Sequence, residues 1–376
     1  FVTNGEEWQH QRRIIDPAFA RGRLHDTFPA MRAAALAARD RLRARAEEIV
    51  EIEAEASHAA ADVIFRTLFS IPIEHEIAAD VFGQFRAHQK AQPLLNLAAF
   101  LPLPRVFPRF HRSRTKVTAR AIRALITRLT EDRMAAIRAG TAPDDLATKI
   151  MTTPDPETGR PFDTAEMVDQ VAIFFLAGHE TSASALAWAL YLLAACPEAQ
   201  DRVAAEVASL PDTAEFSDVS RLTFTRDVFR EALRLYPPVP MMVRQNLRPE
   251  TLRGRAVAPG AQIVLSPWHM HRHERLWERP DEFDPDRWQS EAGRRSARTA
   301  YLPFSSGPRV CPGAGFAMVE GPLLLAYLVR DLRFATVPAR APVPEAHLTV
   351  RSRAGIHLAV TFRDATSQSV SGLKQS

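Results

Sequence analysis

The chain has 376 residues, of which 46% are hydrophobic, 24% charged and 8% aromatic. So much apolar sequence excludes disordered and collagen-like proteins. The net charge is +4, and no basic run is interleaved with aromatic residues, which argues against nucleic-acid binding. The two cysteines, Cys196 and Cys311, are too few for a disulfide framework or a cysteine-based zinc site. A reducing, intracellular compartment is therefore expected.

Five segments have the composition and periodicity of helices. Residues 28–50 are rich in strong helix formers, and four more segments place apolar side chains at a helical period. These four are residues 53–70, 112–139, 163–195 and 313–331. Asp163 and Thr164, followed by Glu166, predict the start of the longest helix. Its apolar part, residues 183–196, is shorter than the roughly 20 residues of a membrane span.

The second half of the chain contains short segments typical of strands. They lie at residues 240–245, 262–266, 333–337 and 356–362, between prolines and charged turns. The sequence contains no internal repeat of fixed period. The fold class expected is mainly α, an α-rich α+β fold with small β-sheets.

One cysteine lies in a glycine-containing loop directly before a predicted helix. Cys311 stands between Gly307 and Gly313, with Arg309 two residues before it. The positive end of a helix and a nearby cation favour a thiolate. From these residues alone, a reactive or metal-binding cysteine and an inert buried one are about equally favoured. A Cys–His nucleophile is a further alternative, although no histidine stands out as its partner.

The pattern Phe-x-x-Gly-x-Arg-x-Cys-x-Gly at residues 304–313 resembles, in full, the haem-binding loop of the cytochrome P450 family. The resemblance implies that Cys311 is the axial thiolate ligand of haem iron. It also implies that Phe304 packs against the porphyrin and that Arg309 pairs with a propionate. Gly313 is the last glycine of the pattern. Cys196, at the end of the longest helix, is expected to be a core residue.

A second resemblance concerns Glu231 and Arg234, three residues apart on a predicted helix before Pro237-Pro238. Alone, such a pair is usually a weak surface ion pair. In the family, a Glu-x-x-Arg helix and a later arginine form a buried structural triad that fixes the cysteine loop. Arg287, in the segment FDPDRW, matches that arginine.

A third resemblance lies midway along the longest helix, where the chain reads AGHET at residues 177–181. Without the family, Gly178 would be a costly helix residue, and Thr181 would be expected to bond to its own helix. In the family this segment is the oxygen-binding groove. The resemblance implies that Gly178 makes room over iron, and that Glu180 and Thr181 relay protons to dioxygen.

The beginning of the chain supplies a fourth resemblance. Trp8 and Arg12 lie one helical turn apart, a common spacing that in the family directs both side chains at haem propionates. Arg244, ten residues after Arg234, matches a further propionate-pairing arginine. Positions on the long helix and after the double proline suggest a substrate lining of Phe174, Ala177, Val239 and Met241.

Three features have competing interpretations. His269, His271 and His273 alternate and would share one face of a strand as a metal site, but a structural role is favoured. The apolar loop 93–108 is expected to cover a substrate channel rather than to dip into a membrane surface. Gly313-Ala314-Gly315 lacks a preceding strand and a third small residue, so a dinucleotide site is not expected.

Together the resemblances imply a haem-thiolate monooxygenase that uses haem b, dioxygen and an external electron donor. No flavin- or nicotinamide-binding segment is present, so a ferredoxin or flavoprotein, supplied ultimately by NAD(P)H, is expected to dock on a basic side. The segment ExxRLYPPVP resembles the eukaryotic-like and fatty-acid-hydroxylating branch more than the camphor-type bacterial branch, which favours a lipophilic substrate. The alternatives are a peroxide-using or isomerising haem-thiolate enzyme, or a non-catalytic haem-binding fragment.

The resemblance extends from Trp8 to about residue 360. We therefore expect one cytochrome P450 domain over residues 1–376, with a disordered tail at about 364–376. Because the chain begins at Phe1 and enters directly at the Trp8 helix, the family's N-terminal strands and first helices are expected to be missing. Its arginine-rich composition indicates a GC-rich genome, and a bacterial source is expected. A cytoplasmic location is also expected, with membrane association left open.

Overall fold

The computed structural model describes residues 3–91 and 113–363. This part of the chain divides into two compact units. The first comprises the chain up to residue 38 and residues 57–183, and the second comprises residues 39–56 and those from 184 onward. The division falls within the helices α2 (Arg21–Arg43), α3 (Ile52–Phe69) and α7 (Thr164–Ala195). The predicted loop 93–108 and the predicted tail 364–376 lie outside the described residues.

The first unit is helical. It contains α1 (Gly5–Ala18), α4 (Glu76–Ala91), α5 (Ser113–Ala139) and α6 (Leu146–Thr152), with parts of α2, α3 and α7. α4 packs along α5, and α6 contacts both α1 and α5. The predicted start of α7 is confirmed, because Asp163 Oδ1 accepts from Glu166 N at 2.8 Å and Glu166 Oε2 accepts from Asp163 N at 2.9 Å.

The second unit is built around α13 (Ala314–Asp331), which packs against α8 (Pro197–Val207) and α10 (Thr223–Leu235). The approach to α10 is close, because a Cβ at Gly321 would lie 2.2 Å from the Phe229 ring. The remaining helices are α9 (Phe216–Ser220), α11 (Pro267–Met270) and α12 (Glu291–Ala300), with 3-10 turns η2 (Pro285–Gln289), η3 (Gly307–Arg309) and η4 (Pro338–Arg340).

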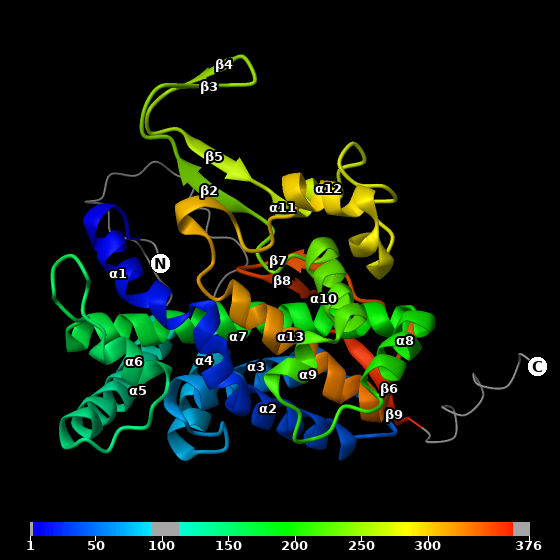
Figure 1. Ribbon diagram of the computed structural model, residues 1–376, viewed down its shortest axis with the longest axis horizontal. Helices are drawn as coiled ribbons and strands as arrows, with labels where there is room; N and C mark the ends of the chain where they lie inside the picture. Colours follow the sequence, from blue (N-terminus) through cyan, green and yellow to red (C-terminus); the bar gives the residue numbers. More distant parts are fainter. Residues whose placement is uncertain (1–2, 92–112, 364–376) are drawn as a thin grey trace, which may run out of the picture. The chain divides into compact units, whose positions relative to one another are not determined.

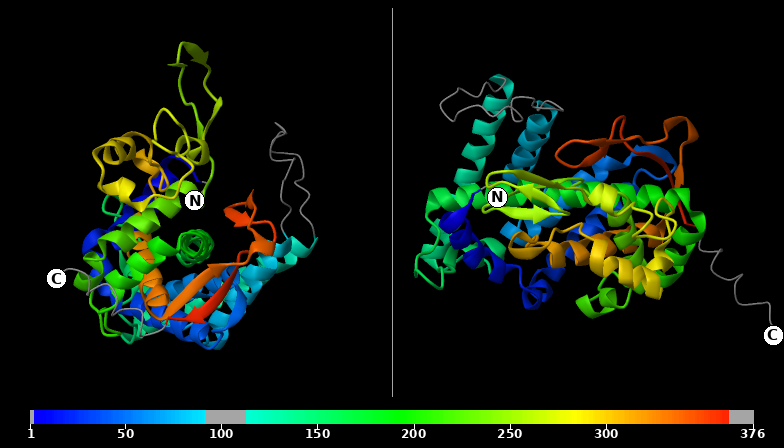
Figure 2. Two further views of the ribbon diagram at one scale, coloured as in Figure 1. Left: turned by 90° about the vertical axis from the view of Figure 1, so that its right-hand side faces the viewer. Right: turned by 90° about the horizontal axis from the view of Figure 1, so that it is seen from above.

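Small antiparallel sheets complete the second unit. The largest has the order β1 (Glu48–Glu51), β9 (His357–Phe362), β6 (Leu332–Thr336), and Figure 2 shows the orange β6 beside the red β9. Ladders of two strands join β2 (Met242–Gln245) to β5 (Gln262–Leu265), β3 (Glu250–Leu252) to β4 (Arg255–Val257), and β7 (Pro344–Ala346) to β8 (Val350–Ser352). The β3–β4 hairpin connects β2 to β5 (Figure 1).

The predicted mainly α fold with small sheets is confirmed, and the four predicted strands correspond to β2, β5, β6 and β9. The prediction of a helix over residues 28–50 is wrong at its end. α2 ends at Arg43, and Glu47 has a φ of 71°, which an α-helix cannot contain. The next four residues form β1, because pairing with β9 buries Val50 completely. In residues 3–91 and 113–363, no helix combines the length and apolarity needed to cross a membrane.

Candidate functional site

The cysteine loop, residues 304–313, is a tight turn that leads into α13. Ser305 and Gly307 adopt left-handed φ angles of 64° and 74°. The chain then returns so that Cys311 N donates to Phe304 O at 2.9 Å. Gly313 forms the N-cap of α13, and its position for a Cβ lies 3.9 Å from Cys311 Sγ, an ordinary contact distance. Cys311 is exposed. Such a cysteine, at the positive end of an 18-residue helix, is suited to act as a thiolate ligand.

Arg244 and Arg309 place two cations at this loop. Arg244 is on β2, and its Nη2 donates to Ser305 Oγ at 2.7 Å. This hydrogen bond holds a residue whose left-handed backbone is unfavourable for a side chain other than glycine. Arg309 is half-buried within η3, two residues before Cys311. Both predicted propionate-pairing arginines of the second unit therefore belong to or contact the cysteine loop.

Glu231, Arg234 and Arg287 lie together in the core of the second unit. Glu231 and Arg234 are both completely buried on α10. Arg234 donates through Nη2 and Nε to the two oxygens of Glu231, at 2.8 and 3.0 Å. Arg287 Nε, from η2, donates to Glu231 Oε1 at 3.2 Å. One carboxylate of α10 thus joins Arg234 on the same helix to Arg287, which lies 56 residues after Glu231.

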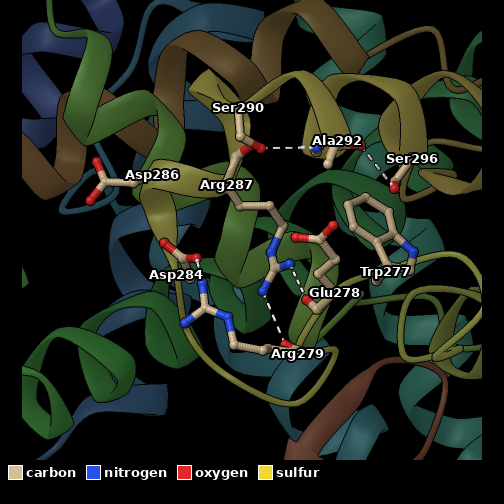
Figure 3. A pocket seen from close by; sticks show the side chains of 10 residues that line it. Trp277, Glu278, Arg279, Asp284, Asp286, Arg287, Ser290, Ala292 and Ser296 are labelled. Atoms are coloured by element: carbon tan, nitrogen blue, oxygen red, sulfur yellow. Dashed lines mark hydrogen bonds and ion pairs between the residues drawn. The ribbon is translucent and has the colours of Figure 1, made fainter.

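The remaining donors of the two arginines are aimed at backbone carbonyls of residues 271–282. Arg234 donates to the carbonyls of His271, Pro280 and Glu282. Arg287 donates to those of Glu278 and Arg279, as Figure 3 shows. The triad therefore determines the path of an irregular segment that precedes the cysteine loop.

A cavity of about 200 Å³ lies beside Arg287 (Figure 3). It is lined by Trp277, Glu278, Arg279, Asp284, Asp286, Arg287, Ser290, Ala292, Gly293 and Ser296. Arg279 pairs with Asp284 at 2.6 Å, and Asp286 pairs with Arg202 at 2.7 Å. Of the charged residues that line this cavity, Arg279, Asp284, Asp286 and Arg287 are therefore paired within the protein.

In the first unit, one turn of α7 carries Gly178, Glu180 and Thr181. Thr181 Oγ1 donates to Ala177 O at 2.7 Å, and Glu180 is buried with 5% exposure. A Cβ at Gly178 would lie 2.7 Å from Ile64 Cδ1, so the glycine permits close packing of α7 against α3. The predicted room over iron and the predicted proton relay stay predictions.

Trp8 and Arg12 meet on α1, as their spacing predicted. The Arg12 guanidinium carbon lies 5.9 Å from the centre of the Trp8 ring. Arg12 Nε also pairs with Asp16 Oδ1 at 2.7 Å, one helical turn onward. Their predicted role toward haem propionates is not tested by these contacts.

A cluster around Asp155 was not predicted from the sequence. His10 Nδ1 lies 2.6 Å from Asp155 Oδ2, and Arg13 Nε donates to Asp155 Oδ1 at 2.8 Å. The Arg13 guanidinium, followed by the His10 hydrogen bond, holds the pKa of Asp155 well below its usual range, against the effect of desolvation. Because α1 and Asp155 are about 145 residues apart, no local pattern could have indicated this cluster.

The four residues predicted to line the substrate site lie in different surroundings. The Phe174 ring packs against Phe19 at 5.5 Å in the first unit, and Ala177 is half-buried there. In the second unit Val239 is half-buried and Met241 is 54% exposed. Their role in substrate binding stays a prediction.

The three alternating histidines lie on α11 and the turn after it, not on a strand. His269 Nδ1 bonds to Ser266 Oγ at 2.8 Å, His273 Nδ1 accepts from Arg275 N at 3.1 Å, and His271 is buried among backbone groups. Within the described ranges no group of three or more His, Cys, Asp or Glu residues could hold a metal ion. Cys196 is half-buried as the N-cap of α8, which corrects the prediction that it is a core residue.

Comparison with known proteins identifies the family. The family model described as Cytochrome P450 matches residues 1–358. Cyclooctatin synthase from Streptomyces melanosporofaciens is 34% identical over 93% of this chain and 76% of that protein. Cyclooctat-9-en-7-ol 5-monooxygenase from the same organism is 32% identical over 90% of this chain and 72% of that protein. The crystal structure of the cytochrome P450DA heme domain has a TM-score of 0.82 and 25% identity, covering 96% of this chain and 78% of that chain.

The described residues fit the haem that this family implies. The exposed Cys311 at a helix start is a suitable thiolate ligand, and Arg244 beside its loop offers a cation for an acidic group. The family also implies an external redox partner. The chain therefore belongs to the cytochrome P450 family and is an oxygen-incorporating oxidoreductase.

Proposed function

We propose that this protein is a monooxygenase that inserts one oxygen atom from O2 into a lipophilic organic substrate, using electrons from a separate redox partner. The observation that carries the proposal is the cysteine loop. It presents an exposed Cys311 at the N-terminus of α13, with Arg244 bonded to the loop and the Glu231 triad in the same unit.

Haem b, when bound, would supply reductive activation of dioxygen, and residues of this chain are proposed to hold it. Cys311 would provide the thiolate ligand, and Phe304 and Gly313 would shape the loop around it. The family resemblance assigns Arg12, Arg244 and Arg309 to the propionates, and these would offer three positive charges for two carboxylates. An excess of cations over buried carboxylates offsets their loss of hydration.

Glu180 and Thr181 are proposed to hold and move the protons that oxygen reduction consumes. Thr181 Oγ1 donates its proton to Ala177 O at 2.7 Å, so donation elsewhere requires only rotation of the hydroxyl group. Glu180, buried at 5% exposure and adjacent in the sequence, is the acid proposed to resupply that proton. Gly178 keeps this part of α7 free of a side chain.

The substrate class is proposed from two sources. The predicted lining residues Phe174, Ala177, Val239 and Met241 are apolar. One relative is named for an alkenol, cyclooctat-9-en-7-ol, which it oxidises at position 5. Electrons are proposed to come from a ferredoxin or flavoprotein and ultimately from NAD(P)H. A bacterial source, a cytoplasmic location and the absence of a nucleic-acid partner remain predictions of the sequence.

A peroxide-using or isomerising haem-thiolate enzyme is the alternative activity. Retention of the acid–alcohol pair Glu180 and Thr181 favours dioxygen, because only the dioxygen reaction needs external protons delivered during reduction. Turnover with a reductase system, compared with turnover on peroxide alone, separates these activities. A haem-binding fragment without activity would turn over with neither.

The proposal is tested by the carbon monoxide difference spectrum of the reduced protein. The wild-type chain is expected to give the red-shifted Soret band of a thiolate-ligated haem. Cys311→Ser is expected to abolish that band, whereas the matched variant Cys196→Ser is expected to retain it. A histidine-type band in the wild type, or an unchanged band in Cys311→Ser, would contradict the proposal.

A further inference from the structure

We propose that His271 is a positioning residue, which connects the Glu231 triad to the cysteine loop and holds that loop in register through the backbone of Leu302. This inference rests on the proposed function, because the loop matters only if Cys311 binds haem. It concerns no direct contact with substrate or haem, since both ring nitrogens of the buried His271 bond to backbone groups.

The imidazole of His271 bridges two backbone groups. His271 follows α11, has no exposed surface, and places Nδ1 3.1 Å from Arg234 O. Leu302 N donates to Nε2 at 2.9 Å. A carbonyl oxygen only accepts and a backbone N–H only donates, so Nδ1 carries the proton and Nε2 the lone pair. The contacts therefore fix one neutral tautomer.

The bridge reaches the cysteine in two further steps. Leu302 O accepts from Ser305 N at 3.3 Å, and Phe304 O accepts from Cys311 N at 2.9 Å. On the other side, Arg234 Nη1 donates to His271 O at 2.8 Å while Arg234 O accepts from the ring. The triad arginine and the histidine thus hold each other through two hydrogen bonds.

Neighbouring rings prevent the imidazole from turning away. The Tyr301 ring lies 5.4 Å from it at an angle of 31°, and the Trp277 ring lies 6.5 Å away, edge-on. Tyr301 Oη donates to Arg230 O at 3.1 Å. Two consecutive residues, 301 and 302, are therefore tied to carbonyl groups of α10, one directly and one through His271.

The surrounding charges keep the ring neutral. Burial lowers the pKa of His271 to about 4, the Arg234 carbonyl opposes this change, and the positive charges of Arg234 and Arg272 add to it. Protonation would place a second N–H against Leu302 N and break the bridge. The same neutral form therefore persists across the physiological pH range.

Two amide variants separate the two halves of the bridge. In His271→Asn the side-chain NH2 replaces Nδ1–H and keeps the bond to Arg234 O, but nothing accepts from Leu302 N. In His271→Gln the side-chain oxygen reaches the Nε2 position and keeps the acceptor for Leu302 N. His269→Asn is the matched control, because His269 is exposed and contacts Ser266.

The measurement is amide hydrogen exchange of residues 302–313 in the full chain without haem. Loss of one neutral hydrogen bond corresponds to roughly fivefold faster opening. We expect His271→Asn to accelerate exchange of this segment about fivefold, with His271→Gln and His269→Asn within about twofold of wild type. Exchange in β6 and β9 reports whether the rest of the unit is intact. Equal acceleration in the Asn and Gln variants, or none in the Asn variant, overturns the proposal.

A measurement without substitution covers the case in which a variant does not fold. The 15N spectrum of histidine-labelled wild-type protein is expected to show His271 protonated at Nδ1 and unprotonated at Nε2 down to about pH 5. Protonation at Nε2 at neutral pH overturns the proposal. Because neither readout uses haem, these results remain separate from the carbon monoxide spectrum. If the wild-type protein gave no thiolate band, the proposed function would be contradicted. The exchange and 15N measurements would still decide whether His271 forms the bridge.

Discussion

The two units each contain a carboxylate that is fully buried between two basic side chains, and the two clusters differ in where the arginines direct their other donors. In the second unit Glu231 joins Arg234 and Arg287, whose remaining N–H groups bond to backbone carbonyls. In the first unit Asp155 joins His10 and Arg13.

The donors of Arg13 that do not reach Asp155 meet two exposed carboxylates. Arg13 pairs with Glu6 at 2.7 Å and with Glu157 at 3.0 Å, and these side chains are 71% and 67% exposed. Donors aimed at a backbone determine the path of a loop, whereas donors aimed at exposed carboxylates only balance charge. The difference indicates that the triad is the cluster that determines local structure.

The largest effect is expected from Glu231→Ala. It leaves the two buried guanidiniums of Arg234 and Arg287 without their shared counter-ion. Breaking a buried pair in this way costs about 3–5 kcal/mol, which is a large part of the stability of a typical domain. Urea titration measures the free energy of unfolding, and haem incorporation is expected to fall with it.

Glu231→Gln is the control for this variant, because it removes the charge but keeps an oxygen for Arg234 and Arg287. Its loss is expected to be smaller than that of Glu231→Ala. Unfolding free energies for both variants equal to wild type would mean that the triad does not stabilise the fold.

The next largest effect is a pH dependence of the free energy of unfolding, which we expect from His271 beside the Glu231 triad. Its pKa falls from 6.5 to about 4 on folding, chiefly through burial. Between these pH values the unfolded chain therefore binds more protons than the folded one. The contribution of neutral His271 to the free energy of unfolding is complete above about pH 6.5 and is lost as pH falls toward 4. The total is of the order of 3 kcal/mol.

Comparing wild type with His271→Gln isolates this contribution. Glu53, whose pKa is raised to about 7 mainly by burial, acts in the opposite sense, since its contribution is lost as pH rises toward 7. The difference between the unfolding free energies of the two proteins cancels Glu53. That difference is expected to shrink as pH falls from 6.5 to 4, and a constant difference would mean that His271 is protonated alike in both states.

The cysteine loop and the triad residues were predicted through the family resemblance, which short motifs carry. The residues alone left the role of Cys311 open and favoured a weak surface ion pair for Glu231 and Arg234. Cys311 needs glycines and a helix start around it, and Glu231 and Arg234 share one helical turn. His271 was also noticed, but its bonding partners, Arg234 and Leu302, are 37 and 31 residues away and become visible only in the fold.

Other features depend on tertiary contacts that no local pattern encodes. Asp155 is an ordinary loop aspartate until α1 brings His10 and Arg13 against it. β1 follows a helix-favouring segment and is a strand only because β9 pairs with it. The close approach of Ile64 to Gly178 likewise follows from the packing of α3 against α7.

The smallest effect is expected from Glu6→Ala, which removes one of the exposed carboxylates paired with Arg13. The Arg13 guanidinium keeps both bonds to Asp155, at 2.8 Å each, so the buried carboxylate remains compensated. Surface ion pairs contribute little because water and salt screen them, and holding a long side chain in place costs entropy.

The melting temperature of Glu6→Ala is therefore expected to equal that of wild type within error, at low and at high salt. Glu157→Ala, the matched variant on the other side of Arg13, is expected to behave in the same way. If either variant lost as much stability as Glu231→Ala, an exposed carboxylate would stabilise its cluster as strongly as the buried Glu231 does. Neither burial nor the direction of the arginine donors would then distinguish the two clusters.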